Sequence, residues 1–439
     1  MGNGSVNGFC RCRFDRRPSP VDAFPMNGGP PHQREAKELG SLPTVPGLKE
    51  AQAMLLDLDP WVLDTQVELT SIPAPPFGEG PRGERMAELF REVGLSGVWV
   101  DEVGNVLAGL SGYPGKPGNP GGSAAKPFII SAHLDTVFPP GTDVTPHISD
   151  VLIRAPGIAD DGRGLAALLA LGRVLSQVPL PLPSPLLFVA TVGEEGIGNL
   201  RGVRHIFREG GPGAQAQGFI SLDGVGLDRI ITRGVGSTRM RITLRGPGGH
   251  SWTDWGLPNP IHALGRLVTA LEDLPLSSKP RTTATVARWG GGKSINAIPQ
   301  EAWVEVDLRS EGGEELALLE AALLRRCEYE AGEAAAQSKE PGKGLAWEVQ
   351  ELGRRPAGAP QENAPLVLAA AEATRALGID PQLAAASTDA NVPMALGIPS
   401  ITLGAGGRAG GIHTLDEWYS NREGPEGILR ALLTLVLLD

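Results

Sequence analysis

Cysteine is scarce in this chain, whose 439 residues include only Cys10, Cys12 and Cys327. So few thiols, two of them in a Gly- and Pro-rich N-terminal stretch, imply no disulfide framework, and a reducing, cytoplasmic setting is the expected location. Long apolar runs are missing too, because no stretch approaches the roughly 20 uncharged residues that cross a bilayer. Insertion into a membrane is therefore not expected.

Clustered positive charge is also absent. The net charge is -11 and no basic stripe runs along any segment, which argues against a nucleic-acid partner. Residues 1–46 have no periodic apolar pattern and no continuous apolar core of a secretory signal, so they are predicted to form a disordered extension. A chain of 439 residues exceeds the usual size of a single core, and two domains are expected.

The sequence does contain short apolar runs that end abruptly in charged residues. Runs at 127–132, 185–192 and 218–222 are typical of strands buried in a parallel sheet. The residues that follow them are His133 with Asp135, Glu194 with Glu195, and Asp223. Because open α/β sheets bind their ligands at the carboxyl ends of the strands, these side chains are expected to meet at one edge.

Five stretches together supply the donors that hydrolytic metal ions prefer. They are His133 and Asp135 in SAHLDTV, Asp160 in GIADDGRG, Glu194 and Glu195 in TVGEEG, Asp223 in SLDG, and His413 in GIHTLDEW. Two histidines and three carboxylates suit two zinc-type ions that share one bridging carboxylate, with an adjacent unliganded Glu to activate water. Each motif alone has an ordinary structural explanation, and only their agreement indicates a dinuclear metallohydrolase.

Strand and helix patterns alternate along most of the chain. Helical patterns at 51–69, 83–93 and 162–178 among the apolar runs predict a three-layer α/β catalytic domain with a mixed, mainly parallel sheet. From about residue 231 the order becomes strand, helix, strand, strand, helix, strand, as in a ferredoxin-like unit. The expected domains are therefore a catalytic domain at 47–230 and 355–439, with an inserted ferredoxin-like α+β lid at 231–354.

Two other classes of protein share part of this residue set. A mononuclear iron oxygenase also uses His-x-Asp with a distant His, but it needs a β-barrel, which the alternation of helices and strands does not favour. A metal-binding or regulatory protein that has lost catalysis would retain the ligands on the same scaffold. The sequence contains Glu194 as well as every expected metal ligand, which favours an enzyme.

The same motifs, in this order around an inserted lid, resemble a known family. His133-Leu-Asp135-Thr, Asp160-Asp161-Gly, Glu194-Glu195-Gly, Asp223-Gly and Ile412-His413-Thr are similar to motifs of the dinuclear zinc metallopeptidases that include peptidase T, carboxypeptidase G, aminoacylase and succinyl-diaminopimelate desuccinylase. The stretch that begins with Ser387-Thr-Asp-Ala-Asn391 and continues through Gly397-Ile-Pro and Leu403-Gly to His413-Thr-Leu-Asp-Glu looks most like the peptidase T-like branch. The resemblance extends from about Gly47 to the end of the chain.

The resemblance implies a role for each residue of the cluster. One ion would be held by His133, Asp160 and Asp223, and the other by Asp160, Glu195 and His413. Asp135 would hydrogen-bond the ring nitrogen of His133 that does not touch metal. Glu194 would be the general base, taking a proton from a water bridged by two metals and giving it to the leaving amine. Two divalent ions per subunit are expected, with Zn²⁺ first and Co²⁺ or Mn²⁺ as alternatives.

The resemblance also implies roles for residues of the lid. His250 in GPGGHS is similar to a loop histidine that reaches the substrate carbonyl oxygen, often in the neighbouring subunit of a dimer, where it would stabilise an oxyanion. Asn296 and Arg309 match positions that contact substrate, and the Arg would grip a carboxylate. A homodimer formed through the lid is also expected. The peptide bond after Asp160 is expected to be cis, and Asp161 is expected to shape the backbone there without binding metal or substrate.

Two amide-cleaving activities are compatible with the motifs. One is a di- or tripeptide aminopeptidase, and the other is an N-acyl amino-acid amidohydrolase or deacylase. In the resembling family, Asp at the position of Asp223 tends to accompany aminopeptidases, whereas Glu accompanies carboxypeptidases and deacylases. The expected substrate is therefore a short peptide with a free amino terminus, and an N-acyl amino acid is the alternative.

Overall fold

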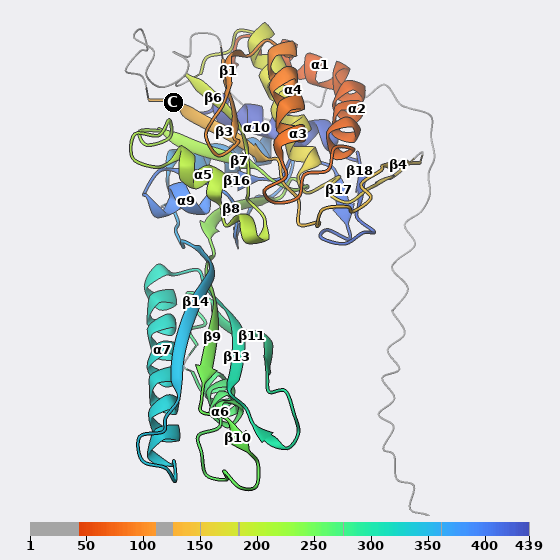
Figure 1. Ribbon diagram of the computed structural model, residues 1–439. Helices are drawn as coiled ribbons and strands as arrows, with labels where there is room; N and C mark the ends of the chain where they lie inside the picture. Colours follow the sequence, from red (N-terminus) through yellow and green to blue (C-terminus); the bar gives the residue numbers. More distant parts are fainter. Residues whose placement is uncertain are drawn as a thin grey trace, which may run out of the picture. The chain divides into compact units, whose positions relative to one another are not determined.

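The computed structural model describes residues 44–110, 126–149, 151–182, 185–274, 276–360 and 362–438. Nearly all of the extension predicted for residues 1–46 lies outside this part of the chain. Within it, an eight-stranded sheet and a four-stranded sheet organise the fold (Figure 1). No helix in the described ranges combines the length and apolar character needed to cross a membrane.

The eight-stranded sheet is mixed and mainly parallel at its centre. In spatial order its strands are β1 (Ser96–Val100), β2 (Val106–Gly109), β6 (Leu186–Thr191), β3 (Phe128–His133), β7 (Gly218–Leu222), β16 (Ser400–Leu403), β8 (Arg229–Gly234) and β15 (Gln382–Ala386). The central neighbours β6, β3, β7 and β16 run parallel to one another. Every residue of β3, β6 and β7 is buried, as expected for strands covered on both faces. The predicted sheet type is confirmed.

Helices cover both faces of this sheet and make the fold three-layered. One face carries α1 (Leu48–Asp57), α2 (Asp59–Thr70), α3 (Gly80–Glu92), α4 (Gly162–Gln177), α8 (Pro365–Ala376) and α10 (Gly424–Val436), and the other carries α5 (Arg201–Ile206) and α9 (Asn391–Ala395) (Figure 1). Successive strand residues face opposite sides, so Ile130 joins the core under α4 whereas Ile129 joins the core under α5 and α9. The helical pattern predicted at 51–69 is divided at Leu58, because Pro60 fits only the first turn of a new helix.

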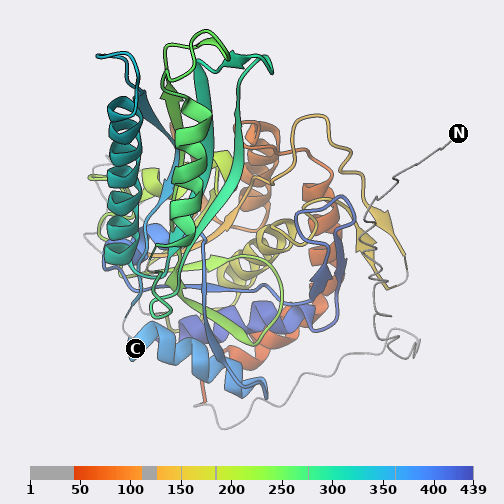
Figure 2. The same cartoon turned by 90° about the horizontal axis from the view of Figure 1, so that it is seen from below.

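The four-stranded sheet belongs to an inserted unit, which we define as residues 236–355. Along the chain it contains β9 (Gly236–Arg245), α6 (Pro260–Glu272), β11 (Thr282–Gly291), β13 (Glu301–Ser310), α7 (Gly313–Ala336) and β14 (Ala346–Arg355). The strands are ordered β11-β13-β9-β14 with antiparallel neighbours, which is the ferredoxin-like arrangement. Helices α6 and α7 lie side by side on one face and share an apolar core with the strands (Figure 2). The expected lid boundary at residue 231 falls inside β8 of the large sheet, so the inserted unit begins later, at Gly236.

Two small sheets complete the described strands. β10 (Gly249–His250) pairs with β12 (Ala297–Ile298) beyond the end of β9. β17 (Arg408–Gly410), β18 (Trp418–Ser420), β5 (Ile153–Arg154) and β4 (His147–Ile148) form the other. Pairing of β18 with β5 joins the segment that carries His413 to the segment that leads to Asp160. This sheet therefore brings together two parts of the site that are distant in sequence.

Candidate metal centre

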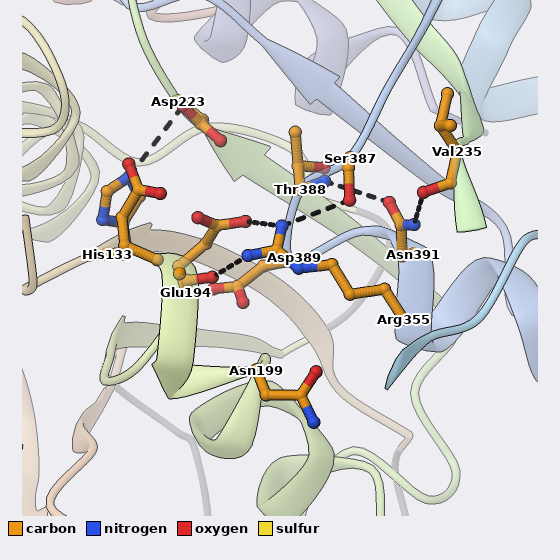
Figure 3. Close-up of polar contacts among 12 residues, drawn as sticks. His133, Glu194, Asn199, Asp223, Val235, Arg355, Ser387, Thr388, Asp389 and Asn391 are labelled. Carbon is orange, nitrogen blue, oxygen red and sulfur yellow. Dashed lines mark hydrogen bonds and ion pairs between the residues drawn. The ribbon is translucent and has the colours of Figure 1, made fainter. Parts of the chain in front are cut away.

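The predicted donors are gathered at the carboxyl end of the large sheet. His133 is the last residue of β3, Glu194 and Glu195 follow the neighbouring strand β6, and Asp223 follows β7 on the other side. Asp160 precedes α4, and His413 lies between β17 and β18. Figure 3 shows His133, Glu194 and Asp223 approaching one another from these strand ends. Parallel neighbours end at one edge, which explains why residues so far apart in sequence meet.

Asp160 lies between the two histidines. Its Oδ1 is 3.0 Å from Nε2 of His133, and its Oδ2 is 3.0 Å from Nε2 of His413. The same His413 nitrogen is 2.9 Å from Oε1 of Glu195, and Oδ1 of Asp223 lies 4.0 Å from Nε2 of His133. One carboxylate that directs an oxygen to each of two histidines has the disposition of a bridging ligand.

The donor set fits divalent metal ions. Three groups have ligand atoms within 4.8 Å of one another: His133 with Glu194 and Glu195, His133 with Asp161 and Asp223, and Asp160 with Glu195 and His413. Imidazole nitrogens and carboxylate oxygens are the ligands that zinc-type ions prefer. So many buried carboxylates also require compensating positive charge. Residues suited to hold metal are therefore present and correctly clustered.

Burial and mutual repulsion set the electrostatics of these carboxylates. Burial raises the pKa of Asp223 to about 7 and raises the pKa of Glu194 well above its usual range, although the Arg355 guanidinium opposes the second shift. Hydrogen bonds with Asp160 and Glu195 raise the pKa of His413 to about 10. The Nε2 atom of His413 thus lies between two carboxylates, that of Asp160 at 3.0 Å and that of Glu195 at 2.9 Å. Raised carboxylate pKa values in such a cluster are typical of functional sites.

Asp161 belongs to one of the three groups of possible metal ligands, but its carboxylate already accepts hydrogen bonds from main-chain amides. Its Oδ2 accepts a hydrogen bond from the amide of His133 at 3.0 Å, and its Oδ1 accepts one from Gly164 at 3.0 Å, which caps α4. Asp160, in contrast, directs both oxygens at imidazoles. The Asp161 carboxylate therefore supports the backbone, whereas that of Asp160 faces the two histidines. The peptide bond between Asp160 and Asp161 is cis, which was also expected.

Asp135 differs from its expected role. The Nδ1 atom of His133 lies 3.0 Å from the main-chain carbonyl oxygen of Asp135, whereas the nearer carboxylate oxygen is 3.8 Å away. The carboxylate instead accepts hydrogen bonds from the amides of Glu194 at 2.9 Å and Glu195 at 2.7 Å. The ring of His133 is thus oriented by the backbone of residue 135, and the Asp135 side chain fixes the turn that carries the Glu pair.

Arg355 is a site residue that the sequence analysis did not identify. It ends β14, is only 5% exposed, and its Nη1 atom donates to Oε1 of Glu194 at 3.0 Å (Figure 3). The expected lid ends at residue 354, so the sequence places Arg355 just beyond it and assigns it no role. An arginine placed where the chain returns to the large sheet was the available signal.

Glu417 is a second residue that the sequence analysis missed. Its buried carboxylate accepts hydrogen bonds from the amides of Gly157 at 2.9 Å, Ala159 at 2.8 Å and Asp160 at 3.1 Å. Glu417 follows His413 by four residues in the same HTLDE stretch. It therefore fastens the loop of one ligand to the loop of another. The acidic end of that stretch was the signal for such a role.

The expected substrate residues of the inserted unit are divided between its two ends. Arg309 lies at the end of β13 that pairs with Ser237, near the junction with the large sheet, where it binds Asp307 at 2.9 Å. His250 and Asn296 lie beyond the opposite end of that strand, in and beside the β10–β12 pair. Eight residues of strand separate the two ends, or roughly 25 Å. Among the described residues, His250 and Asn296 are therefore not part of the cluster of candidate metal ligands.

Comparison with protein families gives one match. A model of peptidase family M20/M25/M40 matches residues 129–436, which include every residue of the metal cluster. No curated protein matches the chain by sequence. The match covers both the large sheet and the inserted unit.

Solved structures with the same fold cover most of the chain. Aminopeptidase PepT from Bacillus cereus ATCC 10987 has a TM-score of 0.69 at 23% identity, over 86% of this chain and 98% of that one. A tripeptidase from Staphylococcus aureus subsp. aureus Mu50 has a TM-score of 0.70 at 22% identity, over 86% and 97%. The YXEP protein of Bacillus subtilis, described as a dinuclear metal binding peptidase from the M20 family, has a TM-score of 0.62 at 16% identity, over 88% and 98%.

Proposed function

The chain belongs to peptidase family M20/M25/M40, a family of hydrolases, and we propose that it cleaves the amide bonds of short peptides as a metal-dependent di- or tripeptide aminopeptidase. The observation that carries the proposal is the Asp160 carboxylate, with one oxygen 3.0 Å from His133 and the other 3.0 Å from His413. Glu194 lies beside this arrangement and belongs to a group with His133 and Glu195.

We assign the ligands of two divalent ions from this geometry. His133, Asp160 and Asp223 would hold one ion, and Asp160, Glu195 and His413 would hold the other. Nitrogen and oxygen donors favour Zn²⁺, with Co²⁺ or Mn²⁺ as alternatives. When bound, such ions supply Lewis-acid activation of water and of the substrate carbonyl group.

The protein's own groups would perform the proton transfers. Glu194 would accept a proton from the attacking water and deliver it to the amine that leaves when the amide bond breaks. Its raised pKa suits this role, because a base must hold the proton and also release it. Asp135 holds the amide of Glu194 at 2.9 Å and so keeps the base at the rim of the metal cluster.

The aminopeptidase direction is supported by the acidity of the site. Asp223, Glu194 and Glu195 crowd the same edge of the sheet, and carboxylates near the reacting bond would attract the ammonium group of a free amino terminus. Arg309, whose side chain is 41% exposed, is the candidate to bind the far carboxylate of a short peptide. An N-acyl amino-acid amidohydrolase remains the competing activity, and the following experiment separates the two.

Free peptides are expected to be better substrates than acylated ones. A dipeptide or tripeptide with a free amine should be hydrolysed in the presence of zinc, cobalt or manganese, and acetylation of that amine should lower kcat/KM at least about tenfold, which is roughly 1.4 kcal/mol. Arg309→Ala should mainly raise KM, through loss of a charged hydrogen bond of about 1.5 to 3 kcal/mol. Arg288→Ala, at an exposed position of β11, is the control. Faster turnover of N-acetyl amino acids than of free peptides would establish the amidohydrolase instead.

The position of His250 supports a homodimer formed through the inserted unit. His250 lies beyond the end of β13 that is opposite to Arg309, and the same tip exposes Trp252 by 84%, Trp255 by 67% and Ile295 by 104%. Large apolar side chains exposed together are typical of a protein interface. We therefore propose that His250 and Asn296 complete the site of a neighbouring subunit, where His250 would stabilise the oxyanion.

Subunit mixing tests this arrangement. The His250→Ala and Glu194→Gln proteins, each expected to be inactive alone, are mixed and allowed to exchange subunits. Half of the dimers should then contain one subunit of each kind, and such a dimer has one intact site of two. The mixture should therefore recover about a quarter of wild-type activity. Each variant assayed alone is the control. A monomer by light scattering at micromolar concentration, or no recovery after proven exchange, would contradict the shared site.

A further inference from the structure

The two chain segments that join the inserted unit to the large sheet are fastened to each other. Gly234 donates its amide to the carbonyl of Gly358 at 2.7 Å, and Gly358 donates back at 3.2 Å. The side-chain amide of Asn391, on α9, donates to the carbonyl of Val235 at 2.9 Å (Figure 3). It also donates to the carbonyl of Pro356 at 2.9 Å. Asn391 is completely buried. The junction is therefore a defined structure, held by one side chain of the large domain.

Arg355 precedes this fastened segment and reaches from it to the catalytic edge. Its Nη1 donates to Oε1 of Glu194 at 3.0 Å and to the hydroxyl of Ser387 at 3.1 Å, while its Nη2 donates to the main-chain carbonyl of Glu194 (Figure 3). One guanidinium thus binds both the side chain and the backbone of the same residue. A planar fork bound at several points has little freedom to reorient.

The turn that carries Glu194 needs such support. Gly193 and Gly196 flank the Glu pair, with φ values of 66° and 47°, in the left-handed region where glycine is the favoured residue. Asp135 fixes the amide of Glu194 from one side, and Arg355 fixes its carbonyl and Oε1 from the other. Among the described residues no hydrogen bond engages Oε2, which leaves that oxygen to meet the water proton.

We propose that Arg355 is a positioning residue, supplied by the last strand of the inserted unit, that aims the free oxygen of Glu194 at the metal cluster. The inference rests on the proposed function, because it assigns Glu194 as the proton acceptor. The inserted unit would then contribute to catalysis through the contact between Arg355 and Glu194, because the orientation of Glu194 would depend on the position of β14. Arg suits this role because its planar fork of donors can hold a carboxylate oxygen and a main-chain carbonyl at once.

Kinetics of Arg355 variants test the proposal. Arg355→Met is expected to lower kcat by about 10²-fold, the scale of a small misplacement of a catalytic group, with KM within threefold of wild type and metal content unchanged. Arg355→Lys should recover part of the loss, since it restores charge without the fork. Arg354→Met is the matched control, because Arg354 is exposed and binds Glu320 at 2.7 Å instead of the site. A raised KM with unchanged kcat would identify Arg355 as a substrate-binding residue and overturn the proposal.

A double-mutant cycle shows whether Arg355 acts through Glu194. In a Glu194→Gln background, Arg355→Met should cause no more than a twofold further loss of kcat, because the group that it positions is already disabled. Full additivity of the two effects would contradict the proposal. Melting temperatures of all variants identify any that fail to fold, in which case Arg355→Lys carries the test.

A structural measurement separates this inference from the proposed function. In a crystal structure of Arg355→Met loaded with zinc, the Glu194 carboxylate should be displaced or disordered relative to the wild-type protein. A carboxylate in the wild-type position would overturn the positioning role whatever the enzyme hydrolyses. Absence of peptide and N-acyl amino-acid hydrolysis by the wild type, together with a displaced Glu194 in the variant, would reject only the proposed function.

Discussion

Glu194→Gln is expected to retain both metal ions and to lose about 10³-fold or more in kcat. Glutamine has nearly the same shape as glutamate, and its amide oxygen can still accept the hydrogen bond that Arg355 makes to Oε1 at 3.0 Å. It cannot, however, accept a proton from water at neutral pH. General base catalysis contributes about 10²- to 10⁴-fold in enzymes, so the loss should fall mainly on kcat. Steady-state kinetics and metal analysis of the same preparation provide the measurement.

The neighbouring residue gives a matched comparison. Glu195 differs from Glu194 by its contact with His413, at 2.9 Å, so Glu195→Gln should lower metal content as well as rate. A loss of metal from Glu195→Gln but not from Glu194→Gln would be hard to explain by general disturbance of the turn, because the two substitutions are adjacent and chemically identical. A Glu194→Gln enzyme with more than about a tenth of wild-type turnover would contradict the assignment of Glu194 as the general base. Loss of metal from the Glu194→Gln enzyme would instead show that Glu194 is a metal ligand.

The parts of the fold that were predictable from sequence depend on local patterns. The fully apolar runs that became β3, β6 and β7 indicated strands covered on both faces, and the Ala/Leu face of α4 indicated a helix on the sheet. The strand order β1-β2-β6-β3-β7-β16-β8-β15 was not predictable, because it depends on pairing between residues up to about 180 positions apart. The boundary at residue 231 was placed too early for the same reason, since nothing local distinguishes β8 in one sheet from β9 in the next.

The candidate site was likewise predictable where it depends on local patterns and not where it depends on long-range contacts. The clustered donors were predictable because parallel strands end at a common edge, so residue type and strand position together located them. Arg355 and Glu417 were missed because their partners are distant in sequence. Arg355 binds Glu194, which is 161 positions away, and Glu417 binds Gly157, which is 260 positions away. The resemblance implies that the carboxylate of Asp135 binds the ring of His133, yet this carboxylate accepts hydrogen bonds from the amides of Glu194 and Glu195 in the folded turn. Long-range hydrogen bonds of this kind leave little trace in a single sequence.

Removal of either histidine is expected to lower metal content from two ions per chain to about one, together with a large loss of activity. His133 and His413 contact different oxygens of Asp160, so each would serve a different ion. A neutral imidazole replaced by Ala leaves one ligand missing, and the remaining carboxylates would not restore the coordination number that zinc requires. Activity that needs both ions would then fall by orders of magnitude even where one ion remains.

The two substitutions should differ in their effect on the fold. His133 is 2% exposed and its ring is held by the backbone of Asp135, whereas the side chain of His413 is 51% exposed. His133→Ala should therefore also lower the melting temperature, because it leaves a cavity. His205→Ala is the control, since His205 also contacts a carboxylate, that of Glu102 at 2.6 Å, but lies outside the metal cluster. Dialysed proteins analysed by mass spectrometry for bound metal give the stoichiometry. Two ions retained in both His133→Ala and His413→Ala would disprove the ligand assignment, because neither ring could then be holding an ion in place.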